Sequence, residues 1–573
     1  MKTKRTISFL FLFCSLAVIS FSCKDDLPLP EINNVEIEGG ETVDGKVKIT
    51  VGENLTFSLK IANVDINKYE WYVDNELVNS SEKFKFTPEK RGEYKISVKV
   101  YNGDGAVTEK AIGEIQVIDP APLIESFTVE NKAVEDIIEV PYIPDSVVFR
   151  VKSSNVEIAG YKWLYNEEEI EDASVDTLKM LPKYSGKLKV VLTNLDGVTT
   201  EQEVGIEGAF KEGLFLFGTT TIGLSFYDPD TETFFRGKDG DIYQQINKEV
   251  LGDGGINDFF IYNNKIYLLV PTSKEKKARV VIADAQTLAK IDIITAENFN
   301  TQTLGEIYNL AIIDDDKAYI GNNKSISGNI SGVRVLNMKD KTLSEPIEGT
   351  AGKLGVEGPA WSRMLKVGND VMVGCGSKIQ IIDGNTDKVK KTIEIDKDRQ
   401  IVDIVKGKDK NIYALVAGKV DKSSATWLWN PVATTSPSVV KIKSEDYSVA
   451  GENELLIDGK GITIKSGLQH ANTTVSLKSD DIYFVEGGWS SNKVYVYNYT
   501  SGVVKEFTDK SGKSGLLSYF SGYMGTDKEG NVFIPTTNYT RSSVGKFGQF
   551  GSYSEETYRV NGDANVISTY QFN

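Results

Sequence analysis

The chain has 573 residues and a formal net charge of −16, from 81 acidic and 65 basic side chains. At roughly 100 to 200 residues per domain, this length predicts several domains, each large enough to bury a core. The acidic residues are spread along the whole chain, and such a polyanion repels phosphate backbones, so nucleic acid is excluded as an expected partner.

Residues 1–22 have the pattern of a secretory signal peptide. A basic start, Lys2 to Arg5, is followed by a short apolar run over residues 7–19, and small residues stand before Cys23. Because a membrane span needs about 20 apolar residues, this run predicts a signal that is removed from the mature chain.

The sequence Ser20-Phe21-Ser22-Cys23 resembles the lipobox of bacterial lipoproteins. This resemblance implies that Cys23 carries acyl chains and anchors the protein to a membrane, with residues 23–30 as the anchor linker. The acidic pair Asp25-Asp26 resembles the export tag of Bacteroidota surface lipoproteins, which implies the outer face of the outer membrane. A solvated linker on a periplasm-facing lipoprotein is the alternative interpretation.

Cysteine usage leaves one thiol in the mature chain. Cys14 leaves with the signal and Cys23 is the anchor, so only Cys375 remains. One thiol cannot form an intramolecular disulfide, and stability must come from hydrophobic cores. We expect Cys375, at the end of the apolar run 371–375, to be a buried strand residue rather than a nucleophile.

Short runs rich in Val, Ile, Tyr, Phe and Thr alternate with Gly- and Asn-rich turns along almost the whole chain, which predicts an all-β fold without convincing amphipathic helices. Within it, residues 31–118 and 119–206 repeat each other at an offset of 92 residues, from Trp71 to Trp163. The two segments resemble the PKD-like or Ig-like β-sandwich modules of bacterial surface proteins. We expect both tryptophans to be core residues rather than ligand platforms.

From residue 207 to residue 573 a longer repeat predicts a β-propeller. Each unit offers four short strands in roughly 45 residues, as a propeller blade requires. Six full units begin near residues 257, 308, 363, 401, 473 and 521.

A seventh blade is expected to be shared between the ends of this region. Residues 213–235 supply three strands, and an orphan strand at Val566–Phe572 would complete the blade and close the ring. The region resembles YncE-like propellers and the surface-lipoprotein propellers of Bacteroidota, some relatives of which capture cobalamin beside a TonB-dependent transporter.

Three short motifs in this region have a structural interpretation. Asp228/Thr231, Asp284/Thr287 and Asp383/Thr386 suit hairpin turns in which the Asp side chain bonds back to the backbone. The stretch Asp383–Asp387 imitates the opening of a calcium loop, but Lys388 stands where the loop needs glycine. We interpret it as a turn of the blade.

The residues offer little for catalysis. His470 is the only histidine, so neither a zinc site nor a Ser-His-Asp triad with a G-x-S-x-G elbow can be assembled, and no phosphate-binding loop is present. We therefore predict no enzyme, no cofactor and no metal. Carboxylate-based lyase or hydrolase chemistry stays open as the least favoured hypothesis, because acidic residues occur everywhere.

Binding is the remaining chemistry. In a propeller, the segments that lead into the innermost strands converge on one mouth of the central channel. These segments hold amides, phenols, an indole and two guanidinia, which suit a polar ligand with flat or apolar faces. The predicted contacts are Asn257, Tyr308, Trp361, Arg363, Arg399, His470, Tyr519 and Asn565, with Asn309, Gln400, Gln469 and Tyr523 beside them.

Structural alternatives stand beside these assignments. The tyrosines could serve blade packing, Arg363 and Arg399 could be charge partners of nearby acids, and His470 could be an ordinary loop histidine. Trp427 and Trp429, in a loop inserted between blade strands, would form a stacking platform for sugar or porphyrin-like rings if they are exposed.

The favoured hypothesis is a surface lipoprotein that binds a small molecule or glycan nutrient, such as a cobalamin-like ligand, at the propeller mouth for a TonB-dependent transporter. The second hypothesis is an adhesion or scaffold protein whose propeller binds other proteins.

Overall fold

The computed structural model describes residues 27–43, 45–134, 136–140, 146–218, 223–236, 240–252, 255–271, 277–323, 331–353, 357, 359, 363–421, 423, 432–464, 473–487, 491, 493–509, 519–520, 522–538, 541–547, 553–561 and 564–568. The chain divides into two compact units. Unit 1 comprises residues 1–137, 146–180 and 186–205, and unit 2 comprises residues 138–145, 181–185 and 206–573. The described residues form strands and only two short helices, α1 (Ile242–Asn247) and α2 (Thr301–Leu304), which confirms the predicted all-β class.

The first module of unit 1 packs two sheets around Trp71. One sheet has the order β1 (Glu31–Glu38), β4 (Leu55–Ala62) and β7 (Phe84–Phe86). The other has the order β2 (Glu41–Val43), β3 (Lys46–Thr50), β9 (Val107–Ile118), β8 (Gly92–Asn102), β5 (Ile66–Val73) and β6 (Glu76–Asn79).

The indole of Trp71 is fully buried, and its ring centroid lies 5.9 Å from that of Phe57 and 5.5 Å from that of Phe84. Its Nε1 donates to the backbone oxygen of Ser81 at 2.9 Å. Trp71 is therefore a core residue, as predicted.

The next segment builds the same kind of module around Trp163. Its sheets are β11 (Lys132–Ala133), β10 (Leu123–Val129), β13 (Val147–Ser154) and β16 (Thr177–Met180), and β12 (Ile137–Glu139), β18 (Thr199–Glu207), β17 (Gly186–Asn194), β14 (Ile158–Tyr165) and β15 (Glu168–Glu169). Trp163 is fully buried and donates from Nε1 to the oxygen of Val175 at 2.9 Å, which confirms the second predicted core tryptophan.

A buried asparagine makes the same hydrogen bonds in both modules. In the first, Asn102 donates to the carbonyls of Leu27 and Pro28, each at 3.0 Å, and its Oδ1 accepts from the N–H groups of Asp104 and Ala106. In the second, Asn194 bonds Asp119, Pro120, Asp196 and Val198, each 92 residues further on. The sequence repeat is thus also a repeat of hydrogen bonds.

These hydrogen bonds show that part of the predicted anchor linker, residues 23–30, belongs to the first module. Residues 27–30 are described, and they are hydrogen-bonded to the first module rather than free of it. The physical reason is that two asparagines and a threonine of the module donate to the four consecutive carbonyls of this segment.

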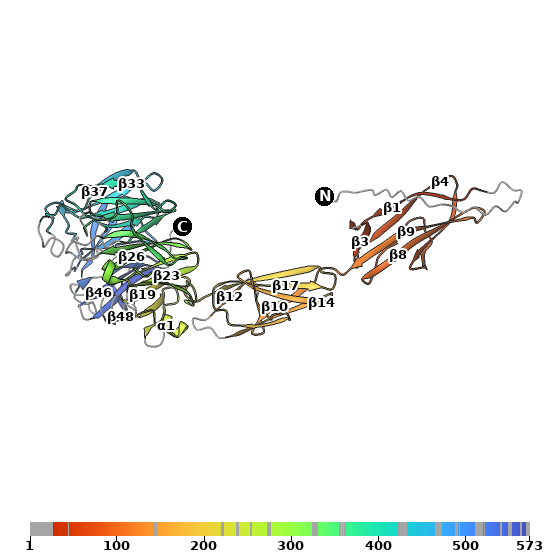
Figure 1. Cartoon of the computed structure of the whole chain (residues 1–573), viewed down its shortest axis with the longest axis horizontal. Helices are drawn as coiled ribbons and strands as arrows, with labels where there is room; N and C mark the ends of the chain where they lie inside the picture. Colours follow the sequence, from red (N-terminus) through yellow and green to blue (C-terminus); the bar gives the residue numbers. More distant parts are fainter. Residues whose placement is uncertain are drawn as a thin grey trace. The chain divides into compact units, whose positions relative to one another are not determined.

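Unit 2 begins with a sheet made from both ends of its chain. Its order is β21 (Thr233–Phe235), β20 (Leu224–Asp228), β19 (Leu214–Gly218) and β49 (Ala564–Ser568). β49 pairs antiparallel with β19 over five residue pairs, from Leu214 with Ser568 to Gly218 with Ala564. Figure 1 shows β19 beside β48, a strand from far along the chain.

Five further four-stranded antiparallel sheets follow in chain order. They are β22 (Asp258–Tyr262), β23 (Lys265–Val270), β24 (Arg279–Asp284) and β25 (Lys290–Ile294); β26 (Glu306–Asp314), β27 (Lys317–Asn323), β28 (Gly332–Asn337) and β29 (Thr342–Pro346); β30 (Leu365–Val367), β31 (Asp370–Cys375), β32 (Lys378–Asp383) and β33 (Lys388–Glu394); β34 (Ile401–Lys406), β35 (Ile412–Val416), β36 (Ser438–Ile442) and β37 (Val449–Glu454); and β40 (Thr473–Val475), β41 (Asp481–Val485), β42 (Lys493–Asn498) and β43 (Val503–Asp509). A small hairpin, β38 (Leu456–Ile457) and β39 (Lys460–Gly461), stands apart from them.

The last sheet differs from the predicted unit, because its first strand is broken. β44 (Tyr519–Phe520) and β45 (Gly525–Thr526) both pair with β46 (Val532–Thr537), which is followed by β47 (Arg541–Phe547) and β48 (Tyr553–Asn561). Gly522, with φ +80°, lies in the break, where the left-handed conformation favours glycine. The interruption leaves Tyr523 outside the ladder and buried.

The sheets pack in a propeller-like manner, through hydrophobic clusters between neighbours. The first strands contact one another in succession, in the order β22, β26, β30, β34, β40, β45 and β49. The first sheet also contacts the second, because the rings of Phe215 and Phe217 each lie 5.8 Å from Phe259. It contacts the last sheet through Tyr227, whose ring is 5.5 Å from Phe533.

Candidate functional site

The candidate site lies where the first strands of the sheets begin. Because successive sheets repeat one antiparallel path, the residues just before and at the start of each first strand lie at one end of the unit. Five polar side chains gather there, and we call them the Arg363 cluster. Its members are Asp258, Tyr308, Arg363, Asp403 and Tyr523.

Arg363 directly contacts two members of this cluster, Asp258 and Tyr523. Its Nη2 donates to Oδ1 of Asp258 at 2.9 Å, and its guanidinium carbon lies 4.4 Å from the centre of the Tyr523 ring. The side chain of Asp258 is 2% exposed and that of Arg363 is 31% exposed. Arg363 is thus a guanidinium held by a buried carboxylate and a buried ring while part of it reaches the surface.

The two aspartates connect neighbouring first strands. Asp258 Oδ1 accepts from its neighbour Phe259 N, and Oδ2 accepts from Leu310 N of β26, each at 2.9 Å. Asp403 repeats the arrangement, accepting from Ile404 N at 2.9 Å and from the backbone and hydroxyl of Thr473 of β40. Each carboxylate therefore fixes the N-terminal end of one first strand to the next sheet.

Burial dominates the electrostatics of the cluster. Burial raises the pKa of Asp258, although the charge of Arg363 opposes the shift. Burial likewise raises the pKa of Asp403 to about 6, against its hydrogen bonds with Thr473 and Ile404. Burial and the nearby carboxylates also raise the pKa of Tyr523, and burial with the Glu306 carboxylate raises that of Tyr308. Both phenols are therefore neutral at physiological pH.

The raised pKa of Asp403 predicts a pH dependence of stability. Below about pH 4 the carboxyl is protonated in both states. Between about pH 4 and 6 only the unfolded chain releases the proton, so the free energy of unfolding falls as pH rises, by about 3 kcal/mol in total from this residue. We expect denaturant titrations from pH 4 to 7 to show this decline in the native chain and to lack it in Asp403→Asn.

The difference in the free energy of unfolding between the native chain and Asp403→Asn reports the contribution of Asp403 alone. The other buried carboxyls, such as Asp258 and Asp241, are common to both chains. The amide of the Asp403→Asn variant also places an N–H group against the N–H of Thr473, so at pH 4 the variant should be less stable than the native chain by about 1 to 3 kcal/mol. This deficit should shrink by about 3 kcal/mol as the pH rises to 7, because only the native chain loses stability there. Equal slopes with pH in the two chains would contradict the prediction.

Of the predicted contacts, the structure brings Arg363 and Tyr523 into direct contact. The hydroxyl of Tyr308 donates to Glu306, and this phenol is close enough to Tyr523 for an electrostatic interaction. Asn257 lies next to Asp258, and its side-chain amide donates to the oxygen of Ile307 in the neighbouring sheet. Asn309 is buried in β26. Gln400 is 2% exposed, and its Oε1 has no hydrogen-bond partner among the described residues.

Arg399 is not part of the cluster. Its guanidinium donates to the oxygen of Ala417, to Ser438 of β36 and to Glu452 of β37. With strands about 4.8 Å apart, a partner on the fourth strand lies roughly 14 Å from the first strand. Arg399 therefore bonds the outer strands of its own sheet. Its ion pair with Glu452 agrees with the alternative interpretation, in which Arg399 is the charge partner of a nearby acid.

The remaining predicted residues cannot be placed as side chains. Trp361, His470 and Gln469 lie outside the described residues, as do Trp427 and Trp429 of the inserted loop. Tyr519 and Asn565 are described only as strand backbone, in β44 and β49.

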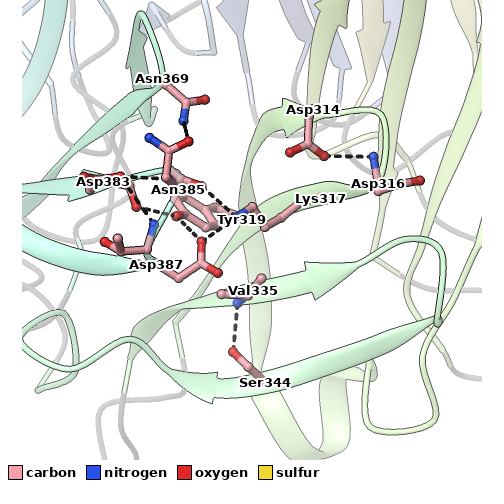
Figure 2. Close-up of polar contacts among 12 residues, drawn as sticks. Asp314, Asp316, Lys317, Tyr319, Val335, Ser344, Asn369, Asp383, Asn385 and Asp387 are labelled. Carbon is pink, nitrogen blue, oxygen red and sulfur yellow. Dashed lines mark hydrogen bonds and ion pairs between the residues drawn. The ribbon is translucent and has the colours of Figure 1, made fainter.

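The stretch Asp383–Asp387 forms a turn between β32 and β33 (Figure 2). Oδ1 of Asp383 accepts from the backbone N–H groups of Asn385 and Thr386, as the hairpin interpretation predicts. Asp387 Oδ1 accepts from Lys317 Nζ at 2.9 Å and from the hydroxyl of Tyr319 at 2.6 Å, both on β27 of the preceding sheet. These carboxylates thus stabilise the turn and its contact with the neighbouring sheet.

The other two predicted turns have the same chemistry. Asp284 Oδ1 accepts from Gln286 N and Thr287 N, and Asp228 Oδ1 accepts from Asp230 N and Thr231 N. The structural interpretation of these motifs is confirmed.

Other reactive groups are sparse in the described part of the chain. Cys375 is fully buried at the end of β31, as predicted, and burial raises the pKa of its thiol to about 12. Among the described residues, no three His, Cys, Asp or Glu side chains are grouped to hold a metal ion. No helix within those residues is long and apolar enough to cross a membrane.

Sequence reasoning missed Asp258 and Asp403, the two carboxylates of the cluster. Each is the one acidic residue inside an apolar first strand, in Asp258-Phe259-Phe260-Ile261 and in Ile401-Val402-Asp403-Ile404. A buried charge needs hydrogen-bond partners or a counter-charge, so an aspartate within an apolar strand was the available signal.

Fold and site together define the class: an all-β protein with a sandwich module that carries a PKD domain and a propeller-like unit. The model described as "PKD domain" matches residues 42–112. The chain belongs to the family described as "Domain of unknown function (DUF5074)", whose model matches residues 210–503, just over half of the sequence. No curated protein matches the sequence.

Several solved structures are similar to the chain. A quinonprotein alcohol dehydrogenase-like protein from Bacteroides thetaiotaomicron is 18% identical, with a TM-score of 0.43, over 78% of this chain and 99% of that one. A protein from Lactobacillus plantarum is 12% identical, with a TM-score of 0.41, over 62% and 99%. TolB from Acinetobacter baumannii is 13% identical, with a TM-score of 0.30, over 62% and 82%.

Proposed function

We propose that this protein is a surface lipoprotein, anchored at Cys23 to the outer face of the outer membrane, that binds a small molecule or glycan for a TonB-dependent transporter. In chain order, two PKD/Ig-like modules follow the anchor and precede a seven-bladed propeller. The Arg363 cluster contributes to the ligand site at the propeller mouth. The protein acts by binding rather than by catalysis.

The proposal of seven closed blades is supported by the pairing of β49 with β19. The first sheet combines the two ends of unit 2 and touches both the second and the last sheet. Closure of this kind leaves no edge strand exposed at the junction of the two ends.

The observation that carries the binding proposal is that the Arg363 guanidinium is fixed in position and partly exposed. Its guanidinium is held in place by Asp258 and Tyr523, so little side-chain entropy is lost when a ligand binds. Its Nε has no hydrogen-bond partner among the described residues. A planar guanidinium with an exposed part suits carboxylate, phosphate or amide oxygens.

A ligand screen tests this proposal. Cobinamides, oligosaccharides and porphyrins are titrated against the full-length chain, and a true ligand should raise its stability by about 2.7 kcal/mol at a hundredfold excess over Kd. Arg363→Lys keeps a positive charge beside Asp258 but loses the planar fork, so we expect it to weaken binding at least tenfold, about 1.4 kcal/mol. Isothermal titration measures both affinities.

Arg399→Lys is the matched control, because Arg399 bonds the oxygen of Ala417 and the outer strands of its own sheet. It should leave the affinity unchanged. If no probe binds, or if the two variants weaken binding equally, nutrient capture at the Arg363 cluster is wrong. A propeller that binds other proteins then becomes the better hypothesis.

A further inference from the structure

The first module exposes apolar side chains at the end from which the chain runs back to Cys23. Leu27 is 43% exposed, Leu29 is 60% exposed and Val107 is 43% exposed. We call these three residues the N-terminal tip. They belong to different segments, the N-terminal segment and the start of β9, and hydrogen bonds hold those segments together.

Hydrogen bonds fix the backbone of residues 27–30 to the first module. Their carbonyls accept in turn from Asn102 twice, from Asn63 at 2.9 Å and from the hydroxyl of Thr108 at 2.7 Å. The N–H of Leu27 donates to Asp104 at 2.8 Å. The Leu27 side chain also lies against the turn before β9, because a Cβ on Gly103 would stand 3.2 Å from its Cδ1.

The length of chain before Leu27 then limits how far the tip can lie from a membrane anchor. Only Lys24, Asp25 and Asp26 stand between Cys23 and Leu27. Four residue steps span at most about 14 Å even when fully extended. The headgroup layer on each side of a bilayer is roughly 5 to 8 Å thick, so a module pinned at Leu27 is held against the membrane surface.

We propose that the N-terminal tip inserts into the headgroup region of the membrane that holds the acyl chains of Cys23. The tip is a second, non-covalent contact that restrains the first module next to the lipid surface. The inference rests on the proposed lipidation of Cys23. Exposed leucine and valine side chains favour this location because the boundary between headgroups and acyl chains removes them from water.

Site-specific labelling of the full-length lipoprotein tests the inference. The environment-sensitive fluorophore NBD is attached to Leu29→Cys or Leu77→Cys, while native Cys375 is fully buried and stays unlabelled. Leu77 is the matched control, since it is 53% exposed in the same module but pairs with Tyr72, near the end of β5 opposite to Ile66, which pairs with Asn102. Each protein is reconstituted into phosphatidylethanolamine and phosphatidylglycerol vesicles.

We expect the Leu29→Cys label to be blue-shifted, quenched by spin-labelled lipid and protected several-fold from aqueous iodide, and the Leu77→Cys label to show none of these. Equal iodide quenching of both labels on vesicle-bound protein would overturn the inference and leave the anchor proposal intact. A protein that fails to associate with the vesicles, as Cys23→Ala should, would instead count against the lipid anchor itself.

Discussion

Deleting residues 564–573 should unfold or aggregate unit 2 while the first module of unit 1 keeps its own unfolding transition. The deletion removes β49 and its five residue pairs with β19. Leu214, Phe215, Leu216 and Phe217 of β19 are fully buried, and the loss leaves their strand as an unpaired edge. At about 0.5 to 1.5 kcal/mol for each lost hydrogen bond, before any apolar exposure, the cost is a large share of a typical folding free energy.

Calorimetry of the deleted and complete chains measures this effect. A shorter deletion, of residues 569–573, leaves the described pairs of β49 intact and serves as the control. An unchanged melting temperature after the longer deletion would show that the two ends of unit 2 do not complete one sheet.

Replacing Cys23 with alanine should release the protein completely from membranes. Each buried CH₂ of an acyl chain contributes about 0.8 kcal/mol, so two or three chains hold the protein far more strongly than a surface contact can. Fractionation of cells and immunodetection of the protein in the soluble and membrane fractions measure the effect.

The export tag is tested separately from the anchor. Replacing Asp25 and Asp26 with alanine should leave the protein in the membrane fraction but protect it from protease added to whole cells. Unchanged surface cleavage in this double variant would rule out the tag, and a membrane-bound Cys23→Ala chain would rule out the lipid anchor.

The sequence by itself determined the strand pattern, the tandem modules and the turns. Alternation of apolar and polar residues sets which strand face is buried. A repeat of 92 residues carries Trp71 to Trp163, and Asn102 with its hydrogen-bond partners to Asn194. The Asp-x-x-Thr turns were predictable because their hydrogen bonds join residues only two or three positions apart. Hydrogen bonds between residues close in the chain can therefore be predicted from the sequence.

Tertiary structure alone decided which polar residues form the candidate site. Asp258 and Arg363 are 105 residues apart, and Asp403 reaches Thr473 across 70 residues, so no spacing rule connects them. The break between β44 and β45, which frees Tyr523 for Arg363, likewise depends on pairing with β46. Arg363 and Arg399 look equivalent in sequence, yet one lies in the cluster at the first strands and the other bonds the fourth strand of its own sheet. The physical reason is that a long side chain is positioned by the nearest buried carboxylate or carbonyl, and only the packed sheets determine which one that is.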